Sequence, residues 1–489
     1  LVAEPGVPDG STSLGRAWDE GVAPGRWQPG TSPNGQALVR DSALGPHLGG
    51  WAASTARRPF RPAAAGAAAT ADDNRLAEFG NHALSANVAR EALADHDGWA
   101  GQDGGTRGGA DAAPGDIHTV RNRAQLVAAL RPHGGPLQRP RIVQVLGRID
   151  LSEGPDGRPL GAEAFAHPAF SWAAFEAAYD PATWGRQPPK GPQEEARAAS
   201  ARAQGEHVVL RVPSRTTLIG LGRGAGFVNG GLMLDRVHDV IIRNLHFSDA
   251  YDHFPAWDPK DNAQGEWNSD HDNLALRGAT RVWVDHCTFD DGQRPDAAER
   301  RLFGRPMQRH DGLLDITRGS DLVTVSWSHF RDHDKTSLVG GSDRHAEDEG
   351  KLRVTYHHNR WEQTRERSPR VRFGAVHLAN NLHEVHDAGA FGYSLGIGHR
   401  ARILSQHNHW QTPAALPPAR LLRRLGNGTL HDQGSLHNGQ PVAWPEAALP
   451  GTTPWQPPYA LPVDPAGEVP GRVRASAGAG RLWTGSAPP

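Results

Sequence analysis

Residues 282–289 read VWVDHCTF and residues 323–330 read VTVSWSHF, so one pattern of apolar, polar and aromatic positions occurs twice. In both stretches a valine is followed two positions later by a second valine, and a phenylalanine comes five positions after that. Such alternation is typical of a β-strand with one buried face. A strand unit that recurs along a chain is the signature of a repeat architecture.

Four further segments follow this template, the last two more weakly. They are Val240/Ile242/Phe247, Val354/Tyr356/Trp361, Val376/Leu378/His383 and Ile403/Ser405/Trp410. The final positions of the six segments are 42, 41, 31, 22 and 27 residues apart, which suits one turn of a parallel β-solenoid with or without an added loop. An antiparallel sandwich is the alternative, but its hairpin signals at intervals of about 8–12 residues are missing between the segments.

We therefore predict an all-β protein, a right-handed parallel β-helix with long loops and short capping helices. Helical sequence between Ser152 and Gln204 and the proline-rich tail after Gln411 are the expected caps. Residues 1–88 are rich in Gly, Pro and Ala, and residues 57–71 (RRPFRPAAAGAAATA) are typical of a linker. We expect a poorly ordered N-terminal extension or linker over residues 1–88 and one β-helix domain over residues 89–489.

Charge and composition narrow the class of partner. The net charge of −2 and the pI of about 7.0 exclude a whole-molecule field that would attract nucleic acid or anionic lipid. No apolar run approaches the roughly 18 residues of a membrane helix. The single Cys287 excludes an intrachain disulfide and a multi-cysteine metal site. We expect neither nucleic acid nor a membrane as a partner, and a polyanion would have to be bound by a local cluster.

Three motifs suggest known binding sites but lack the required spacing or structural context. Residues 220–225 (GLGRGA) fit the GxGxxA dinucleotide fingerprint, yet the following GFVNGGLML predicts a turn and a strand where that chemistry needs a helix N-terminus. His357-His358 and the HEVH of residues 383–386 do not have the spacing of the helical zinc motif. We expect a corner of the solenoid at the first motif and structural histidines at the second and third.

Two pairs of carboxylates lie at similar places in successive repeats. Asp270 and Asp272 alternate in SDHDN, and Asp311 and Asp315 are the first and last residues of DGLLD. Asp272 precedes its aromatic position by 17 residues and Asp315 by 15, so stacked repeats would bring the pairs to neighbouring coils, about 5 Å apart. Converging carboxylates repel one another, and Ca²⁺ is the hard cation that takes such oxygen ligands. Exposed acids on loops are an equally open interpretation of these residues alone.

Basic residues repeat in the same way. Lys335 comes five residues after Phe330 and Arg367 six after Trp361, so stacking would place the two on neighbouring coils. Arg370 and Arg372 alternate in RVRF and share a strand face. A cation cluster beside an acidic cation site is costly unless an anionic ligand bridges the two.

Six blocks of the sequence together resemble one family. They are WNSDHDN (267–273), VWVDHCTF (282–289), HDGLLDI (310–316), VTVSWSHFRDHDKTSLVG (323–340), VTYHHN (354–359) and RSPRVRFGAVHLANN (367–381). In this order they resemble the signature blocks of the calcium-dependent pectate lyases, the first polysaccharide lyase family, which folds as a right-handed parallel β-helix. The resemblance spans roughly residues 89–485 and leaves residues 1–88 without a counterpart.

The resemblance implies roles for single residues. Asp272, Asp311 and Asp315 would be Ca²⁺ ligands, and Asp270 stands where some members have a fourth acid. Arg367 would abstract the proton, while Lys335 and Arg372 would bind the substrate carboxylate and the developing charge. Because arginine is normally protonated, we expect its crowding by cations to lower the pKa of Arg367.

These roles imply a secreted, extracellular pectate lyase that cleaves polygalacturonate in pectin by β-elimination, and we expect a monomer. The rival classes are a β-helix polygalacturonase, a non-catalytic β-helix used for adhesion, and a calcium-independent pectin lyase. A polygalacturonase needs paired acids, for which Asp290-Asp291 is the candidate. Adhesion needs no joint set of acids, lysine and arginines, and a pectin lyase would not keep the acid cluster.

Overall fold

The computed structural model describes residues 89–131, 139–445 and 455–482 in full. Within residues 1–88 it gives the backbone of short strands only, which pair in parallel as β1 with β4, β2 with β5 and β3 with β6. They are β1 (Gly15–Arg16), β2 (Gln36–Arg40), β3 (Ala43–Leu44), β4 (Trp51–Ala52), β5 (Arg75–Phe79) and β6 (His82–Ala83). The expected N-terminal extension thus lies largely outside the described residues, and this part of the domain division stays a prediction.

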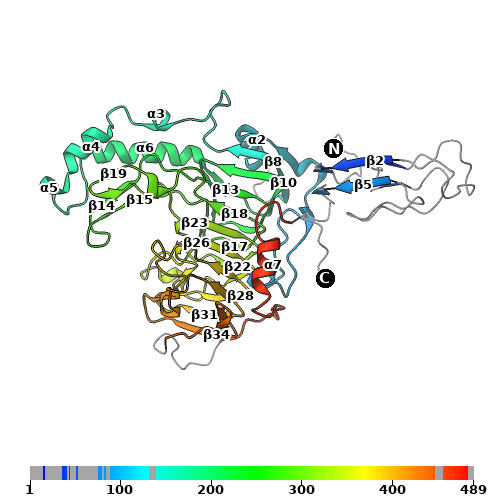
Figure 1. Cartoon of the computed structure of the whole chain (residues 1–489). Helices are drawn as coiled ribbons and strands as arrows, with labels where there is room; N and C mark the ends of the chain where they lie inside the picture. The colour runs from blue at the N-terminus through cyan, green and yellow to red at the C-terminus, as the bar shows by residue number, and fades with distance from the viewer. Residues whose placement is uncertain are drawn as a thin grey trace, which may run out of the picture.

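Three parallel sheets, which we name A, B and C, wind around one core (Figure 1). Each coil of the chain supplies one strand to sheet C, then one to sheet A, then one to sheet B. β8 (Arg141–Asp150) and β10 (Thr216–Val228) bend and belong to both A and B. This confirms the predicted parallel β-helix and excludes the antiparallel sandwich.

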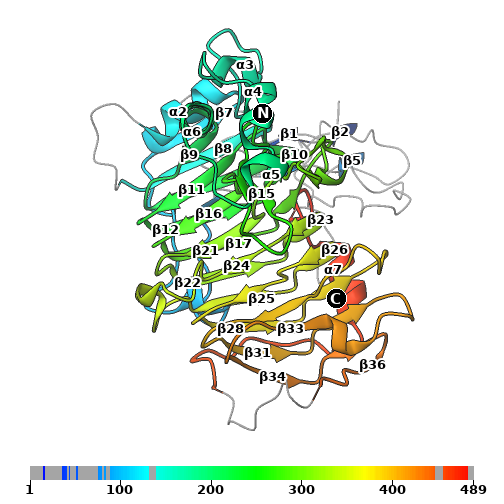
Figure 2. The same cartoon turned by 90° about the vertical axis from the view of Figure 1, so that its left-hand side faces the viewer.

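The remaining strands of the three sheets have the following bounds. Sheet A contains β7 (Ile117–Val120), β12 (His238–Arg243), β17 (Thr280–Asp285), β22 (Asp321–Ser326), β25 (Val354–His357), β28 (Ala375–Ala379), β31 (Arg402–Gln406) and β34 (Thr429–Gln433). Sheet B contains β13 (His246–Ser248), β18 (Thr288–Asp290), β23 (His329–Lys335), β26 (Arg360–Glu366), β29 (Leu382–Glu384), β32 (His409–Gln411) and β35 (Leu436–His437), which β36 (Gln440–Pro441) joins in antiparallel fashion. Sheet C contains β9 (Val209–Arg211), β11 (Gly231–Asp235), β16 (Leu274–Arg277), β21 (Leu314–Thr317), β24 (Leu338–Val339), β27 (Arg370–Val371), β30 (Leu395–Ile397) and β33 (Leu422–Arg424); Figure 2 shows several of them stacked one above another.

The six repeat segments stack in the register that the sequence predicts. Val282 pairs with Val323, and the aromatic positions Phe289 and Phe330 pair with each other. The rings of this position form one file through the core, with Phe289 and Phe330 stacked at 5.0 Å and Phe330 and Trp361 at 4.4 Å. Each fully buried aromatic side chain contributes about 1.5–3 kcal/mol, so this file is a main source of the coil-to-coil stability.

Polar side chains fix the corners between sheets A and B. The backbone N–H of Ser328 donates to Asn359 Oδ1 at 2.9 Å, that of Asn359 to Asn381 Oδ1 at 3.1 Å, and that of Asn381 to Asn408 Oδ1 at 2.7 Å. Because these groups are buried, each pairing removes the cost of an unsatisfied donor. The Gly220–Ala225 segment is also a corner, since it lies where β10 bends between the two sheets.

The helical excursion after Ser152 is real, but it does not close an end of the solenoid. It contains α3 (Ala162–Phe165), α4 (Trp172–Tyr179), α5 (Pro181–Trp184) and α6 (Pro192–Val208), which lie beside the first coils of sheet C (Figure 2). Its aromatic residues pack against two hairpins, β14–β15 and β19–β20, whose strands are β14 (Ala256–Asp258), β15 (Glu266–Asn268), β19 (Arg301–Leu302) and β20 (Arg305–Pro306). The cap at the first coils is α2 (Arg123–Leu130), which buries Leu126 and Leu130 in the main core.

The tail after Gln411 caps the last coils in part, because Trp444 packs edge-on against Trp410. The later segment 455–482 instead runs back along the side of the solenoid, where α7 (Val469–Ser476) contacts Leu382 (Figure 1). The short 3-10 helices are η1 (Trp99–Gly101), η2 (Pro114–Asp116), η3 (Asp296–Ala298), η4 (Ala346–Asp348) and η5 (Pro418–Leu421). In the described ranges, none of the helices combines the length and the apolar character needed to span a bilayer.

Candidate active site

The predicted carboxylates meet at one edge of sheet C. Long connections from sheet B to sheet C end at β16 and β21, whose Leu274 and Leu314 pair in register. Asp272 lies two residues before β16, Asp311 lies three before β21, and Asp315 is the second residue of β21. The stacking inferred from the repeat offsets therefore brings these three residues together.

Asp272 and Asp315 converge over Gly312. The Gly312 backbone N–H donates to Asp272 Oδ1 at 2.8 Å. A Cβ at this position would lie 2.3 Å from Asp315 Oδ1 and 3.0 Å from Asp272 Oδ1, so any side chain would displace a carboxylate. Asp315 Oδ1 also accepts the Leu338 backbone N–H at 3.0 Å, which ties it to the next coil.

The acids repel one another, and this repulsion adds to the effect of burial on their pKa values. Burial, and then the neighbouring carboxylate of Asp311, raise the pKa of Asp315 to about 7. Burial and the charges of Asp315 and Asp311 raise the pKa of Asp272 well above its ordinary value. The pKa of Asp270, which is an exposed residue, is raised as well, by partial desolvation from the surrounding residues and then by the charges of Asp252 and Asp311.

These residues fit a hard divalent cation. A bound cation of this kind would remove the repulsion that raises the three pKa values, and the cradle over Gly312 already aims two carboxylate oxygens at one place. No three acidic or histidine side chains of the described residues form a closed cage. Asp272 and Asp315 are thus the best-placed ligands, with Asp311, Asp270 or the oxygens of a bound substrate needed to complete a shell.

Lys335 lies beside the acids. It is the last residue of β23, and its Nζ is 3.8 Å from Asp311 Oδ1. The same ammonium donates to Asn268 Oδ1 at 3.0 Å. Asn268 ends β15, whose Trp267 is fully buried in the aromatic cluster with α4. The packing of the helical excursion therefore helps to orient the ammonium of Lys335.

Arg367 follows β26 on the next coil, one residue out of line with Lys335. The strand partner of Lys335 is Glu366, and Arg367 comes directly after it with a positive φ of 60°. Its Nε is 3.2 Å from Glu366 Oε1. The neighbouring-coil placement expected from the sequence is confirmed, with this offset of one residue.

The expected lowering of the Arg367 pKa does not come from the protein's own residues. Burial acts to lower the pKa, but the carboxylates of Glu366, Asp315 and Asp311 outweigh it and raise the pKa above its ordinary value. The cations around Arg367 could be expected from the sequence, whereas the effect of Glu366 on its pKa could not. The pKa of Arg370 is the lowered one, because of burial and then of the neighbouring Arg372.

Arg370 and Arg372 extend the basic side along sheet C. Arg370 pairs with Leu338 of β24, and its Nε is buried without a partner among the described residues. Arg372 is engaged at two points, since its Nε contacts Asp343 Oδ1 at 2.7 Å and its Nη1 donates to the Gly340 carbonyl at 2.9 Å. A substrate anion at Arg372 would therefore compete with Asp343.

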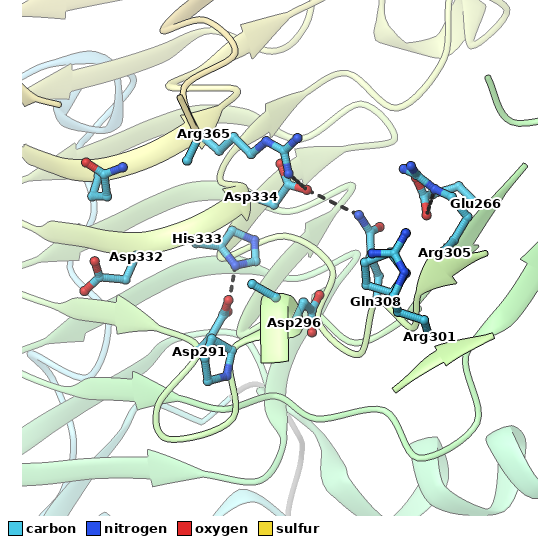
Figure 3. A pocket seen from close by; sticks show the side chains of 15 residues that line it. Glu266, Asp291, Asp296, Arg301, Arg305, Gln308, Asp332, His333, Asp334 and Arg365 are labelled. Carbon is cyan, nitrogen blue, oxygen red and sulfur yellow. Dashed lines mark hydrogen bonds and ion pairs between the residues drawn. The ribbon is translucent and has the colours of Figure 1, made fainter. Parts of the chain in front are cut away.

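Two hollows flank these residues. A groove of about 870 Å³ lies between α6 and the outer face of sheet C, and Asp270 and Asp272 line it. Another cavity of about 500 Å³ lies among the connections beyond sheet B, where His333 bonds to Asp291 and Gln308 to Asp334 (Figure 3). Of the predicted site residues, Asp270 and Asp272 line the first hollow, and none lines the second.

Three contributing residues escaped the sequence analysis. Asn268 lies in the WNSDHDN block two positions before Asp270, and this alternation was the available signal. Gly312 lies inside DGLLD, and Glu366 directly precedes Arg367. The histidines are structural, as expected: His383 belongs to the aromatic file at 4.7 Å from Trp410, and His358 stacks on Trp327 at 4.3 Å.

A parallel β-helix that carries converging carboxylates beside lysine and arginine at one edge of sheet C is typical of a class of enzymes that act on acidic polysaccharides. The comparisons with known proteins place the chain within that class. The family model described as pectate lyase matches residues 193–481. The pectate lyase of Bacillus subtilis is 40% identical over 405 residues, which cover 82% of this chain and 96% of that protein. Pectate lyase D of Dickeya chrysanthemi is 35% identical over 73% of this chain and 81% of its own length.

Solved structures agree with this assignment. A mutant of the Bacillus subtilis pectate lyase has a TM-score of 0.77 at 39% identity and covers 81% of this chain and 99% of its own. A pectate lyase from Acidovorax avenae has a TM-score of 0.72 at 31% identity over 79% of this chain and 94% of its own. The chain belongs to the pectate lyase family and is a pectate lyase.

Proposed function

We propose that this enzyme cleaves (1→4)-α-D-galacturonan by calcium-assisted β-elimination to give 4,5-unsaturated oligogalacturonides, with Arg367 as the base. The observation that carries the proposal is the meeting of the two charged groups: Lys335 Nζ lies 3.8 Å from Asp311, beside the Asp272–Asp315 pair. A galacturonate carboxylate is an anion that can bridge a cation held by the acids and the ammonium of Lys335.

The reaction removes the proton at C5 of a galacturonate and breaks the bond from C4 to the glycosidic oxygen. Proton loss creates an enolate-like dianion at the carboxylate, and Ca²⁺ bound by Asp272, Asp315 and Asp311, with Asp270 nearby, would supply positive charge there. Lys335 and Arg372 would bind the same carboxylate. One unit charge at about 4 Å and an effective dielectric near 20 contributes about 4 kcal/mol, or roughly three decades of rate.

The base must lose its own proton before it can accept one. Among the protein's own residues, Glu366, Asp315 and Asp311 raise the pKa of Arg367. Neutralisation of the two aspartates would remove part of this effect and bring the pKa of Arg367 down. Since the deprotonated fraction still rises with pH, the turnover should increase into the alkaline range.

The polygalacturonase alternative is less well supported by its candidate acids. Asp290 accepts from His246, Ser248 and Arg331, and Asp291 accepts from His333 at 2.6 Å. Both carboxylates are thus engaged in structural pairs and are not free for acid–base work. We also propose that the enzyme acts outside the cell, since its substrate is a polymer, and that it is a monomer.

The test is the appearance of unsaturated product. Incubation with de-esterified polygalacturonate should give a rise in ultraviolet absorbance from the new double bond, and highly methylated pectin should react more slowly because its carboxylates are masked. Release of reducing ends without an absorbance change would indicate a hydrolase. A preference for methylated pectin would show that the cations do not recognise carboxylates.

A further inference from the structure

The groove beside α6 continues beyond the carboxylates that would bind calcium. Its floor is the outer face of the first strands of sheet C, and its wall is α6, which contributes Arg202. A second hollow of about 450 Å³ joins it along the same face, and Arg211, Met233 and Arg277 line both. The candidate active site therefore opens onto a longer track, which passes over the outer faces of β9, β11 and β16.

The register of sheet C shows the course of this track. One row of outward-facing positions runs through Arg211, Met233, Ala275 and Asp315. Ala275 is the residue next to Asp315 in this row, and its small side chain leaves the floor open there. Arg277 lies two residues further along β16 on the same face, about 6.6 Å from Ala275. Arg277 therefore lies on the strand next to that of Asp315, two residues beyond the position that pairs with it.

The guanidinium of Arg277 is free to bind an anion. It is exposed and has no hydrogen-bond or ion-pair partner among the described residues. This distinguishes it from the neighbouring arginines. Arg211 and Arg236 both contact Asp235, at 2.7 Å and 3.1 Å, and Arg197 contacts Glu194 at 2.8 Å.

We propose that Arg277 binds the carboxylate of a galacturonate residue beyond those at the cleavage site, in the track over Ala275 and Met233. This inference rests on the proposed function, because it assigns a further part of the same polyanion to this surface. Charge complementarity selects the occupant: Arg277 is a cation without an ion-pair partner among the described residues, and an unsubstituted uronate supplies the missing anion. Longer oligogalacturonates should therefore be better substrates than short ones.

The test compares tri- and hexagalacturonate at saturating Ca²⁺ in the wild type and in Arg277→Gln. The ratio of kcat/KM for hexamer over trimer should fall by about three- to fivefold in the variant, the size that an exposed ion pair can supply. Arg277→Lys should retain part of the ratio. The matched control is Arg236→Gln, which removes the same charge from an 82% exposed side chain that is already paired with Asp235.

A titration of the metal distinguishes substrate binding by Arg277 from an effect of Arg277 on calcium affinity. If Arg277 only balances the charge of Asp272, Arg277→Gln should change metal affinity and leave the hexamer-to-trimer ratio at the wild-type value, which would overturn the proposal. An equal fall in Arg236→Gln would also overturn it, because a diffuse field would then explain the effect. Absence of unsaturated product from every oligomer would instead contradict the proposed function itself.

Discussion

The acidic and basic halves of the site are placed by different means. Asp272 and Asp311 end long connections from sheet B to sheet C, at residues 249–273 and 291–313. Lys335 and Arg367 stand at connections of only a few residues, 336–337 and 367–369. Short connections inherit the register of the strands, whereas long ones need their own networks to hold the side chains.

The long connections have such a network. The buried His310 bonds to Asp249 at 3.0 Å and to Asp296 at 2.7 Å, which joins the two connections just before Asp311. The basic half needs less support of this kind because Lys335 belongs to β23 itself. The acidic half therefore depends on its loops and, under the proposed function, on a bound cation, while the basic half depends on side-chain shape.

Removal of calcium tests the acidic half as a whole and should have the largest effect. Chelation should abolish turnover, because Asp272, Asp311 and Asp315 then repel one another and the substrate carboxylate. Added Ca²⁺ should restore activity, and Mg²⁺ should do so poorly because it gives up water reluctantly for a loose carboxylate site. Product absorbance measures both. Full activity after exhaustive chelation would contradict the calcium assignment.

Arg367→Lys tests the basic half. The variant keeps the charge but changes its reach and the placement of its donors. If Arg367 takes the C5 proton, a displacement of about 1 Å can cost about a hundredfold, so turnover should fall by at least that factor while folding and Ca²⁺ affinity change little.

Arg370→Lys is the matched control for this variant. Arg370 lies on the same strand face as Arg372 but outside the proposed base position, so its loss of turnover should be smaller. Similar losses in both variants would mean that the cluster acts only as a collective positive field. Steady-state rates on polygalacturonate, with calcium titrations as the folding check, decide between the two.

Gly312→Ala sharpens the account of the acidic half. The new Cβ would lie 2.3 Å from Asp315 Oδ1, so one carboxylate must move. We expect Ca²⁺ affinity to fall by about tenfold, the lower end of what disturbed ligand orientation costs. Gly224→Ala is the control, because a Cβ there meets nothing within 4 Å. Unchanged affinity in Gly312→Ala would show that the cradle is not the metal site.

The sequence allowed the solenoid to be predicted closely, for a physical reason. Its inward positions repeat because neighbouring coils must bury the same face. The sequence spacing of Phe289 and Phe330 therefore predicts that they stack. The acids and Lys335 could be placed by the same offsets. The effect of Glu366 on the pKa of Arg367 could not be predicted, since it depends on a strand register that only the structure defines. The route of residues 455–482 could not be predicted either, because a segment that docks only once along the side of the solenoid leaves no repeat in the sequence.

Asn268 joins the two halves, and its substitution should have the smallest effect. Its Oδ1 accepts a hydrogen bond from Lys335 Nζ at 3.0 Å, while the other neighbour of that ammonium is Asp311. Asn268→Leu keeps the approximate volume but removes the acceptor, so the ammonium should turn toward Asp311 and away from the developing charge. A hydrogen bond to a charged group contributes about 1.5–3 kcal/mol, and we expect the lower end, about a tenfold loss.

The loss should appear mainly in kcat, because Lys335 acts on charge that develops during the reaction. Gln264→Leu is the control on the same hairpin, with an exposed side chain between β14 and β15. A rise in KM with unchanged kcat would mean that Asn268 contributes to substrate binding alone. Equal kinetics in the two variants would show that β23 positions Lys335 without help from the hairpin, and the basic half would then owe nothing to the helical excursion.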